Sequence, residues 1–419
     1  MQAHRSPRIA LLSLALAALG VLPGCATPPT TRPGDKGPAP VRDARPVDRA
    51  GPPRVAVLLP ETGQHLTAAT ALRDGIMAAY YARPAAERPE LRFYPAPPDA
   101  FGTVAMLQEA AQAGASVAIG PLDKTAVAEV AAAPSLPLTV LALNQADAGS
   151  PRSPSLYQFA LAPEDEAEQA AERAWADGYR TTAVITPIGS WGDRVHASFR
   201  ARWEALGGQV TAHERYDAAP NDLGPAVAAA VGVDAGRQRH DELEQILGRR
   251  LEYAAPASAE GRCVFVAGTA SKVRDLRREL HRQGGSGLTA YGTSSAWNGD
   301  ATPASEAGLV PIRIPDMPWL VADEQQGPVG RATLAAAIPA SAQSPLRRLY
   351  PMGIDSLDLL PHLERLRTPG QSFDGQTGNL SLDSQRRLHR RLVWIELSSH
   401  GMKVLGYDAP GATRPAAAR

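Results

Sequence analysis

The stretch Val55–Tyr81, VAVLLPETGQHLTAATALRDGIMAAYY, determines the fold class. Arg54–Leu59 is a short, continuous apolar run ended by Pro60, which is typical of a strand buried on both faces. Over residues 64–81 the apolar side chains then recur at helical spacing, at Leu66, Leu72, Ile76 and Tyr80. This strand and helix form the first unit of a β/α chain.

The same alternation of short apolar strands and helical segments continues to about residue 294. The further predicted strands are Leu91–Tyr94, Ser116–Ile119, Leu138–Leu143, Tyr157–Leu161, Thr182–Thr186, Gln209–Glu214, Arg262–Ala267 and Leu288–Gly292. Apolar strands joined by helices predict parallel sheets that are covered on both faces. The pattern restarts after residue 161, so we expect two doubly wound lobes with a cleft between them.

The lobe boundaries follow from this restart. Residues 54–160 form the predicted first lobe and residues 161–294 the second, which carries a more polar, helical insertion at 221–253. Residues 295–365 are expected to return to the first lobe, and residues 366–406 to the second, with strands around Asn379–Leu382 and Arg391–Leu397. Residues 407–419 form a predicted disordered tail.

The N-terminus is predicted to be an export and lipidation signal. A basic start, with His4, Arg5 and Arg8, precedes an apolar run at residues 9–22. That run is shorter than the roughly 20 residues needed to span a bilayer, but it suits a signal-peptide core. It ends in Leu22-Pro23-Gly24-Cys25, which resembles the bacterial lipobox. We therefore predict that residues 1–24 are removed and that Cys25 is lipidated; an ordinary signal peptide is the alternative.

The residues after the lipobox point to the outer membrane and to a tether. In bacteria resembling enteric ones, an aspartate after the cysteine retains a lipoprotein in the inner membrane, and here the residue is Ala26. Residues 25–53, rich in Pro, Gly, Thr and Arg, are predicted to form a disordered tether. In a polyproline-like state the tether could reach roughly 90 Å from the membrane.

Composition and missing motifs exclude several function classes. Lys+Arg and Asp+Glu both number 43, which argues against a nucleic-acid partner. The nine histidines lack the spacing of a zinc site, and no dinucleotide-binding, phosphate-binding or hydrolase motif is found in the sequence. With Cys25 modified, Cys263 has no disulfide partner. We therefore predict neither a metal nor a cofactor, and a protein that is not an enzyme.

Ligands of open α/β sheets bind at the carboxyl ends of the strands, which places five candidate residues near the cleft. They are Thr62, Lys124, Asn144, Trp191 and Ser294. Helix capping or solvation explains Thr62 and Lys124 as well as a ligand does. Asn144 is suited to ordering its own loop, and Trp191 either walls the cleft or packs on the following helix. Asp123, a predicted helix cap, would repel a ligand carboxylate. Whether the cleft holds a small molecule stays open.

Several motifs, in chain order, resemble penicillin-binding-protein activator lipoproteins of the LpoA (LppC) family, in the part of those proteins that resembles periplasmic binding proteins. The matching segments are Val55–Tyr81, Ile119–Leu122, Leu141–Asn144, Gly189–Gly192, the insertion Val233–Tyr253, Ile314–Trp319 (IPDMPW), Leu349–Asp355 (LYPMGID) and Gly375–Leu382 (GQTGNLSL). The resemblance covers Arg54 to about Gly406. It implies a type I periplasmic-binding-protein fold of two lobes.

The same resemblance implies a function that needs no catalytic residue. It predicts an outer-membrane lipoprotein, facing the periplasm, that binds and activates a class A penicillin-binding protein, a bifunctional peptidoglycan synthase, and so promotes peptidoglycan cross-linking. One departure is that the family's longer members carry a helical-repeat domain where this sequence has the short tether. The alternative is a substrate-binding lipoprotein that captures an amino acid or small peptide for a transporter. Amino-acid-binding relatives commonly place a hydroxyl residue where Asp123 and Lys124 stand here.

Overall fold

The computed structural model describes residues 53–96, 102–147, 153–217, 223–250, 261–299, 302–322 and 328–407, without the side chains of 233–239. These residues all belong to one unit, which spans residues 51–419. The predicted signal peptide, the Cys25 lipidation site and nearly all of the tether lie outside the described residues, as does most of the predicted tail. None of the described helices is long and apolar enough to cross a membrane.

The first lobe is built on an eight-stranded mixed sheet, in the order β11-β12-β13-β5-β4-β3-β1-β2. Strands β1 to β5 pair in parallel, whereas β12 is antiparallel to both of its neighbours, β11 and β13. The strands are β1 (Arg54–Leu59), β2 (Glu90–Pro95), β3 (Val117–Ile119), β4 (Thr139–Ala142), β5 (Leu156–Phe159), β11 (Ser372–Gly375), β12 (Gly378–Leu382) and β13 (Arg387–Arg391).

The second lobe has a seven-stranded mixed sheet, in the order β15-β14-β10-β9-β8-β6-β7. Its parallel strands β6 to β10 are followed by an antiparallel pair, β14 and β15, at one edge. The strands are β6 (Thr181–Pro187), β7 (Gln209–Tyr216), β8 (Arg262–Val266), β9 (Thr289–Tyr291), β10 (Ile312–Asp316), β14 (Val393–Ser398) and β15 (Gly401–Gly406).

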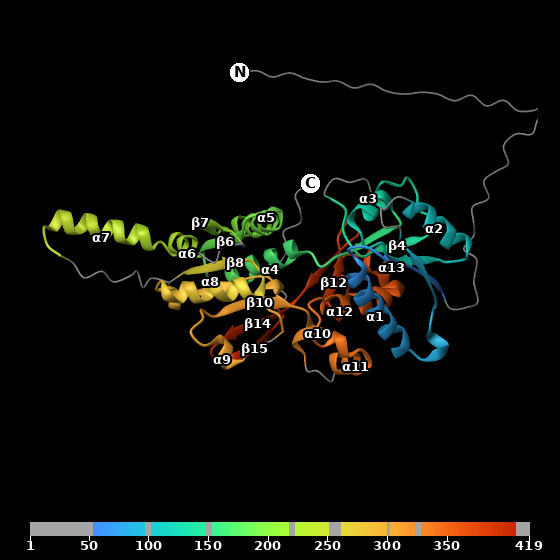
Figure 1. Cartoon of the computed structure of the whole chain (residues 1–419). Coiled ribbons are helices and arrows are strands. Elements are labelled where there is room, and N and C mark those ends of the chain that lie inside the picture. Colours follow the sequence, from blue (N-terminus) through green and yellow to red (C-terminus); the bar gives the residue numbers. More distant parts are fainter. Residues whose placement is uncertain are drawn as a thin grey trace, which may run out of the picture. The chain divides into compact units, whose positions relative to one another are not determined.

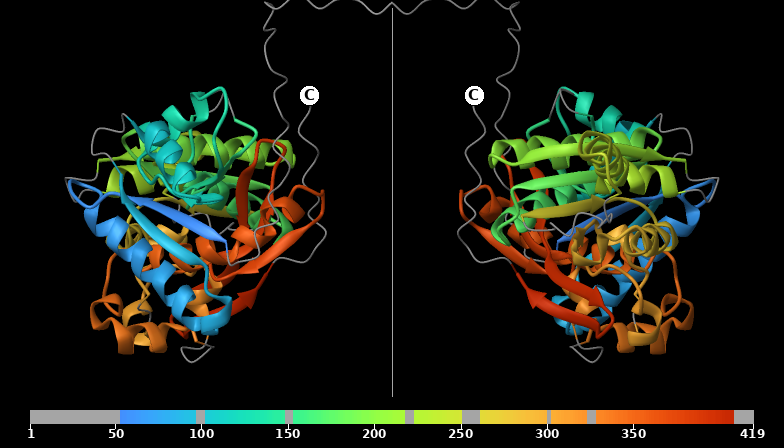
Figure 2. Two further views of the ribbon diagram at one scale, coloured as in Figure 1. Left: turned by 90° about the vertical axis from the view of Figure 1, so that its right-hand side faces the viewer. Right: turned by 90° about the vertical axis from the view of Figure 1, so that its left-hand side faces the viewer.

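Helices cover both faces of each sheet, as the apolar strands predicted (Figures 1 and 2). Along β1, Val57 packs toward α1 and α12, and Leu58 packs toward α2 and α3 on the other face. The helices are α1 (Leu66–Ala82), α2 (Thr103–Gln112), α3 (Lys124–Ala132), α4 (Pro163–Ala176), α5 (Ser190–Ala205), α6 (Gly224–Val231), α7 (Val233–Leu247), α8 (Ala270–Arg282), α9 (Pro303–Glu306), α10 (Pro318–Val321), α11 (Arg331–Ala337), α12 (Leu349–Asp358) and α13 (Leu363–Leu366).

The insertion region contains two helices of different character. Val227 and Ala230 of α6 are buried in the core of the second lobe. Helix α7 extends away from that lobe in Figure 1, and Leu243, Ile246 and Leu247 near its end are exposed. Only α7 is therefore an addition to the sheet-and-helix frame.

The chain crosses between the two sheets three times, and the second and third crossings lie later in the chain than predicted. Residues 295–365 were expected in the first lobe, but β10 belongs to the second sheet. Residues 366–406 were expected in the second lobe, but β11, β12 and β13 belong to the first sheet. The hydrophobic pattern of a strand predicts whether the strand is buried, but it does not predict which sheet the strand joins. Here β13 pairs with β5, and β10 pairs with β9.

Helices α1 and α12 touch through two glycines. A side chain at Gly75 would come within 2.0 Å of the Tyr350 carbonyl oxygen, and one at Gly353 within 2.2 Å of the Leu72 carbonyl oxygen. The two helices pack with their backbones in direct contact, which only glycine permits at these positions. Both glycines lie in segments that carry the family resemblance.

Candidate functional site

Two of the predicted cleft residues lie at the carboxyl edge of the first sheet. Thr62 is exposed in the loop between β1 and α1. Lys124 begins α3, and its ammonium group lies 2.6 Å from the carboxylate of Asp147. Asp123 caps α3 as predicted, because its carboxylate accepts hydrogen bonds from the backbone N–H groups of Thr125 and Ala126. The side chains of Asp123 and Lys124 are thus engaged within the protein.

The other three predicted residues have different surroundings. The Asn144 amide donates to the Leu122 carbonyl, and its oxygen accepts from the backbone N–H of Gln145, so this side chain orders its loop. Trp191, near the start of α5, is half-buried against the core of the second lobe. Ser294, after β9, is buried. Of the five, it is Ser294 that lies in a polar network at the junction of the lobes.

The centre of that network is the ion pair between Arg348 and Asp316. Arg348 Nη2 lies 2.6 Å from Asp316 Oδ2, and Nε lies 3.0 Å from Oδ1, which is a bidentate geometry. Asp316 is fully buried at the end of β10. Burial disfavours the charge of Arg348, but Asp316 outweighs this effect and raises the pKa of the guanidinium. Arg348 also donates to the carbonyl of Ser294 at 2.8 Å.

A second buried ion pair extends the network to α4 and β13. Glu166 Oε2 accepts from the backbone N–H of Ser294 at 2.9 Å, and Oε1 accepts from Arg390 Nη2 at 3.0 Å. Both partners of this pair are buried. Glu166 follows the first crossing between the sheets, Asp316 stands at the second, and Arg390 precedes the third. The network therefore ties the three crossings together.

Asp355 holds a neighbouring segment of the same junction. Asp355 lies on the buried face of α12. Its carboxylate accepts hydrogen bonds from the backbone N–H groups of Gln376 and Thr377, at 2.7 and 2.8 Å, and from the Thr377 hydroxyl. The carbonyl of Gln376 in turn accepts the backbone N–H of Trp319 at 3.1 Å. Burial, opposed in part by these hydrogen bonds, raises the pKa of Asp355 to about 7.

The raised pKa of Asp355 predicts a pH-dependent stability. In the unfolded chain this carboxyl titrates near its ordinary value of 3.8, so between about pH 4 and pH 7 the folded state holds a proton that the unfolded state has lost. Its stabilising contribution is therefore full below about pH 4 and is lost as the pH rises to about 7. The urea midpoints of the wild type and of Asp355→Asn should be measured across this range. As the pH rises from about 4 to about 7, the midpoint of the wild type should fall relative to that of the variant. A constant difference between the two would contradict the prediction.

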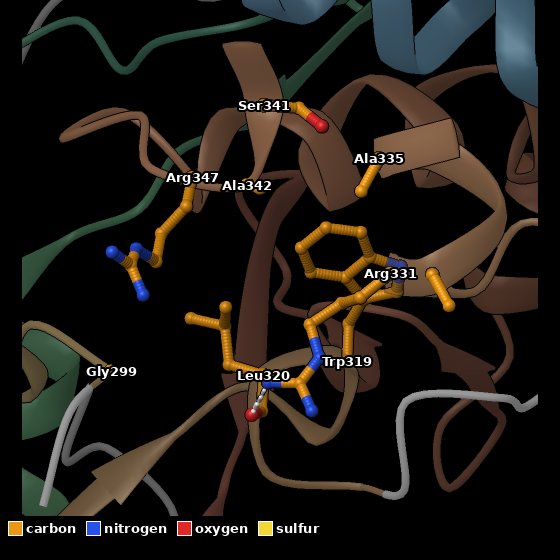
Figure 3. A pocket seen from close by; sticks show the side chains of 9 residues that line it. Gly299, Trp319, Leu320, Arg331, Ala335, Ser341, Ala342 and Arg347 are labelled. Carbon is orange, nitrogen blue, oxygen red and sulfur yellow. Dashed lines mark hydrogen bonds between the residues drawn. The ribbon is translucent and has the colours of Figure 1, made fainter. Parts of the chain in front are cut away.

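A cavity of about 260 Å³ opens beside Trp319 (Figure 3). Its lining residues come from α10, α11, the turn at Pro339–Ser341 and the segment before α12, with Gly299 contributed by the loop after β9. They are Gly299, Trp319, Leu320, Arg331, Ala332, Ala335, Ser341, Ala342 and Arg347. Trp319 is held by two hydrogen bonds, because its indole Nε1 donates to the Val329 carbonyl and its backbone N–H donates to the Gln376 carbonyl. The sequence alone did not predict this cavity.

Within the described residues, one group of side chains has spacing compatible with a metal ion. The sequence did not predict this group, because the nine histidines are dispersed along the chain. His240, Asp241 and Glu244 of α7 have ligand atoms within 4.8 Å of one another. His240 lies 3.4 Å from Asp241 and 3.8 Å from Glu244, and positions one and four residues apart on the same helix account for their closeness.

Comparison with known proteins identifies relatives of this chain. The "Penicillin-binding protein activator LpoA" of Pantoea ananatis is 29% identical over 305 residues, which cover 69% of this chain and 44% of that protein. The chain thus spans less than half the length of the curated relatives it matches.

Solved structures with the same fold fall into two groups. The "LpoA (YraM) C-domain from Haemophilus influenzae, a regulator of PBP1A" superposes with a TM-score of 0.63 and 23% identity, covering 84% of this chain and 99% of that domain. A "putative branched-chain amino acid ABC transporter" protein from Chromobacterium violaceum gives a TM-score of 0.58 with 24% identity, covering 82% and 99%. These likenesses confirm the two-lobed, periplasmic-binding-protein-like fold.

The family model described as "LppC putative lipoprotein" matches residues 34–400, which include both lobes and the segments that build the junction. This chain therefore belongs to the LppC family.

Proposed function

We propose that this chain is lipid-anchored through Cys25 on the periplasmic side of the outer membrane, where it binds and activates a class A penicillin-binding protein. The observation that carries the proposal is the family match over residues 34–400, together with relatives named as activators of penicillin-binding proteins. The matched region contains the Asp-Met-Pro-Trp segment, which supplies Asp316 to the junction and Trp319 to the cavity.

The junction supports a role as a binding partner. Two ion pairs, Arg348–Asp316 with its carboxylate buried and Glu166–Arg390 with both partners buried, join segments at all three crossings. Both pairs connect the two lobes, so moving the lobes apart would break them. A surface that is already ordered before its partner arrives loses less conformational freedom on binding. Activation of the synthase then requires binding alone, with no catalytic group from this chain.

The full chain, added to the organism's class A synthases during turnover of lipid-linked precursor, should raise the fraction of cross-linked peptides. We expect a saturable rise with one synthase, because a specific partner surface has a finite affinity. The measurement is the cross-linked fraction in the digested product, with heat-unfolded chain as the control. An unchanged fraction with every synthase, at concentrations well above micromolar, would exclude direct activation.

A transporter's substrate-binding protein is the second candidate, since the fold is shared with amino-acid transport proteins. Such a protein closes around its ligand, whereas Asn144 and Lys124, predicted for this cleft, make hydrogen bonds or an ion pair within the protein. We therefore expect amino acids and short peptides to leave the melting temperature unchanged. A ligand at 100 times its dissociation constant would add about 2.7 kcal/mol, a shift that is readily measured by thermal unfolding. A reproducible rise with one amino acid would favour the transporter function instead.

A further inference from the structure

The cavity beside Trp319 combines an apolar wall with a cation, Arg347, that has no acidic partner among the described residues. Trp319, Leu320 and three alanines line most of it, and Arg347 stands at its edge (Figure 3). The other lining arginine, Arg331, is committed, because its two terminal nitrogens donate to the carbonyls of Leu320 and Ala322. Arg331 therefore serves to hold α10 against α11.

Arg347 is positioned but has no acidic partner among the described residues. Its Nε donates to the Ser344 carbonyl at 3.4 Å, and neither Nη atom has an acceptor within the described part of the chain. Gly299 makes room for it, because a side chain there would come within 1.8 Å of Arg347 Nη1. The guanidinium is thus oriented by its surroundings, while its two terminal nitrogens have no acceptor among the described residues.

These features define the chemistry of a ligand. A guanidinium with two free nitrogens is suited to a carboxylate, which it can bind in bidentate fashion. The indole and the alanines favour an apolar group on the same ligand. The described residues that line the cavity include two arginines and no Asp or Glu, so their charge favours an anionic ligand. The cavity, at about 260 Å³, has room for one or two side chains.

We propose that the Trp319 cavity is an anchor site for an acidic, apolar peptide segment of the synthase, whose carboxylate binds Arg347 while its apolar neighbour packs on Trp319. This inference rests on the proposed function, because it takes the synthase as the occupant. The positive charge at the edge of an apolar cavity carries the assignment: it matches an aspartate or glutamate beside a hydrophobic residue.

Two measurements on the full chain test the site. In the first, N-acetyl-leucine is titrated into chain labelled with ¹⁵N-tryptophan, and N-acetyl-leucinamide serves as the uncharged control. The indole signal of Trp319, assigned from a Trp319→Phe variant, should shift with the acid and not with the amide. In the second, the dissociation constant for the synthase is compared between wild type, Arg347→Gln and Arg200→Gln. Arg200 is a matched control on α5, where it pairs with Glu204 at the surface.

The expected result is that Arg347→Gln abolishes the response to N-acetyl-leucine and weakens synthase binding about tenfold or more, while Arg200→Gln changes neither. An unaltered melting temperature shows that Arg347→Gln still folds. If Arg347→Gln binds the synthase as wild type does, the proposal is overturned, and a lost response to the acid would then indicate a site for small carboxylates. If wild type itself fails to bind any synthase, the proposed function falls together with this site.

Discussion

Replacing Arg348 by alanine should lower the free energy of unfolding by about 3–5 kcal/mol, because it leaves a buried carboxylate without its partner. Asp316 is fully buried, and Arg348 supplies both of the guanidinium hydrogen bonds that it accepts. The carbonyls of Ser294 and Trp297 would lose their donor as well. Urea unfolding followed by circular dichroism measures the loss.

Two further variants separate the ion pair from the general effect of shortening an arginine. Arg200→Ala, which breaks an exposed pair with Glu204, should cost less than about 1 kcal/mol. Arg348→Met combined with Asp316→Leu should be less damaging than Arg348→Ala, since removal of both charges leaves neither unpaired. A loss below about 1 kcal/mol for Arg348→Ala would mean that the network does not hold the junction together.

The parts of the fold that follow from local pattern could be predicted from the sequence. Strand β1 has the predicted bounds, Arg54–Leu59, because an apolar run ended by proline is a local signal. The Asp123 cap was predictable for the same reason, since a cap bonds to residues two and three positions ahead. The short strands β11, β13 and β15 were missed because none of them has a continuous apolar run.

The junction could not be predicted, because its partners are far apart in sequence. Glu166 and Arg390 are separated by 224 positions, and Asp316 and Arg348 by 32. The sequence has 43 acidic and 43 basic residues, and no local pattern in it indicates which of them form buried pairs. Ser294 was selected for its place after a strand, and the structure gives it a backbone role in the network, with its N–H and carbonyl both engaged. The contacts of Ser294 with Glu166 and Arg348 are made by its backbone and not by its hydroxyl.

The contact between α1 and α12 predicts the second large effect. Substituting Gly353 by valine should cost about 3 kcal/mol or more and disrupt the first lobe, because the added carbons would meet backbone atoms that cannot move aside. The first carbon alone would lie 2.2 Å from the Leu72 carbonyl oxygen and 3.0 Å from the Gly75 Cα.

The Gly353→Ala variant is a sharper test, because the sign of its effect on the free energy of unfolding depends on how closely α1 and α12 pack. On an uncrowded helix, Gly→Ala stabilises by up to about 1 kcal/mol through helix propensity. At Gly353 the same change should instead destabilise, by about 1–3 kcal/mol, because a single methyl group already overlaps the facing backbone. Ala336→Val, on the exposed side of α11, reports the ordinary cost of valine in a helix and should lie within about 1 kcal/mol of wild type. Urea unfolding of the three variants gives the comparison. A stabilised Gly353→Ala would mean that α1 and α12 are farther apart than described, and that the glycines at positions 75 and 353 serve something other than close packing.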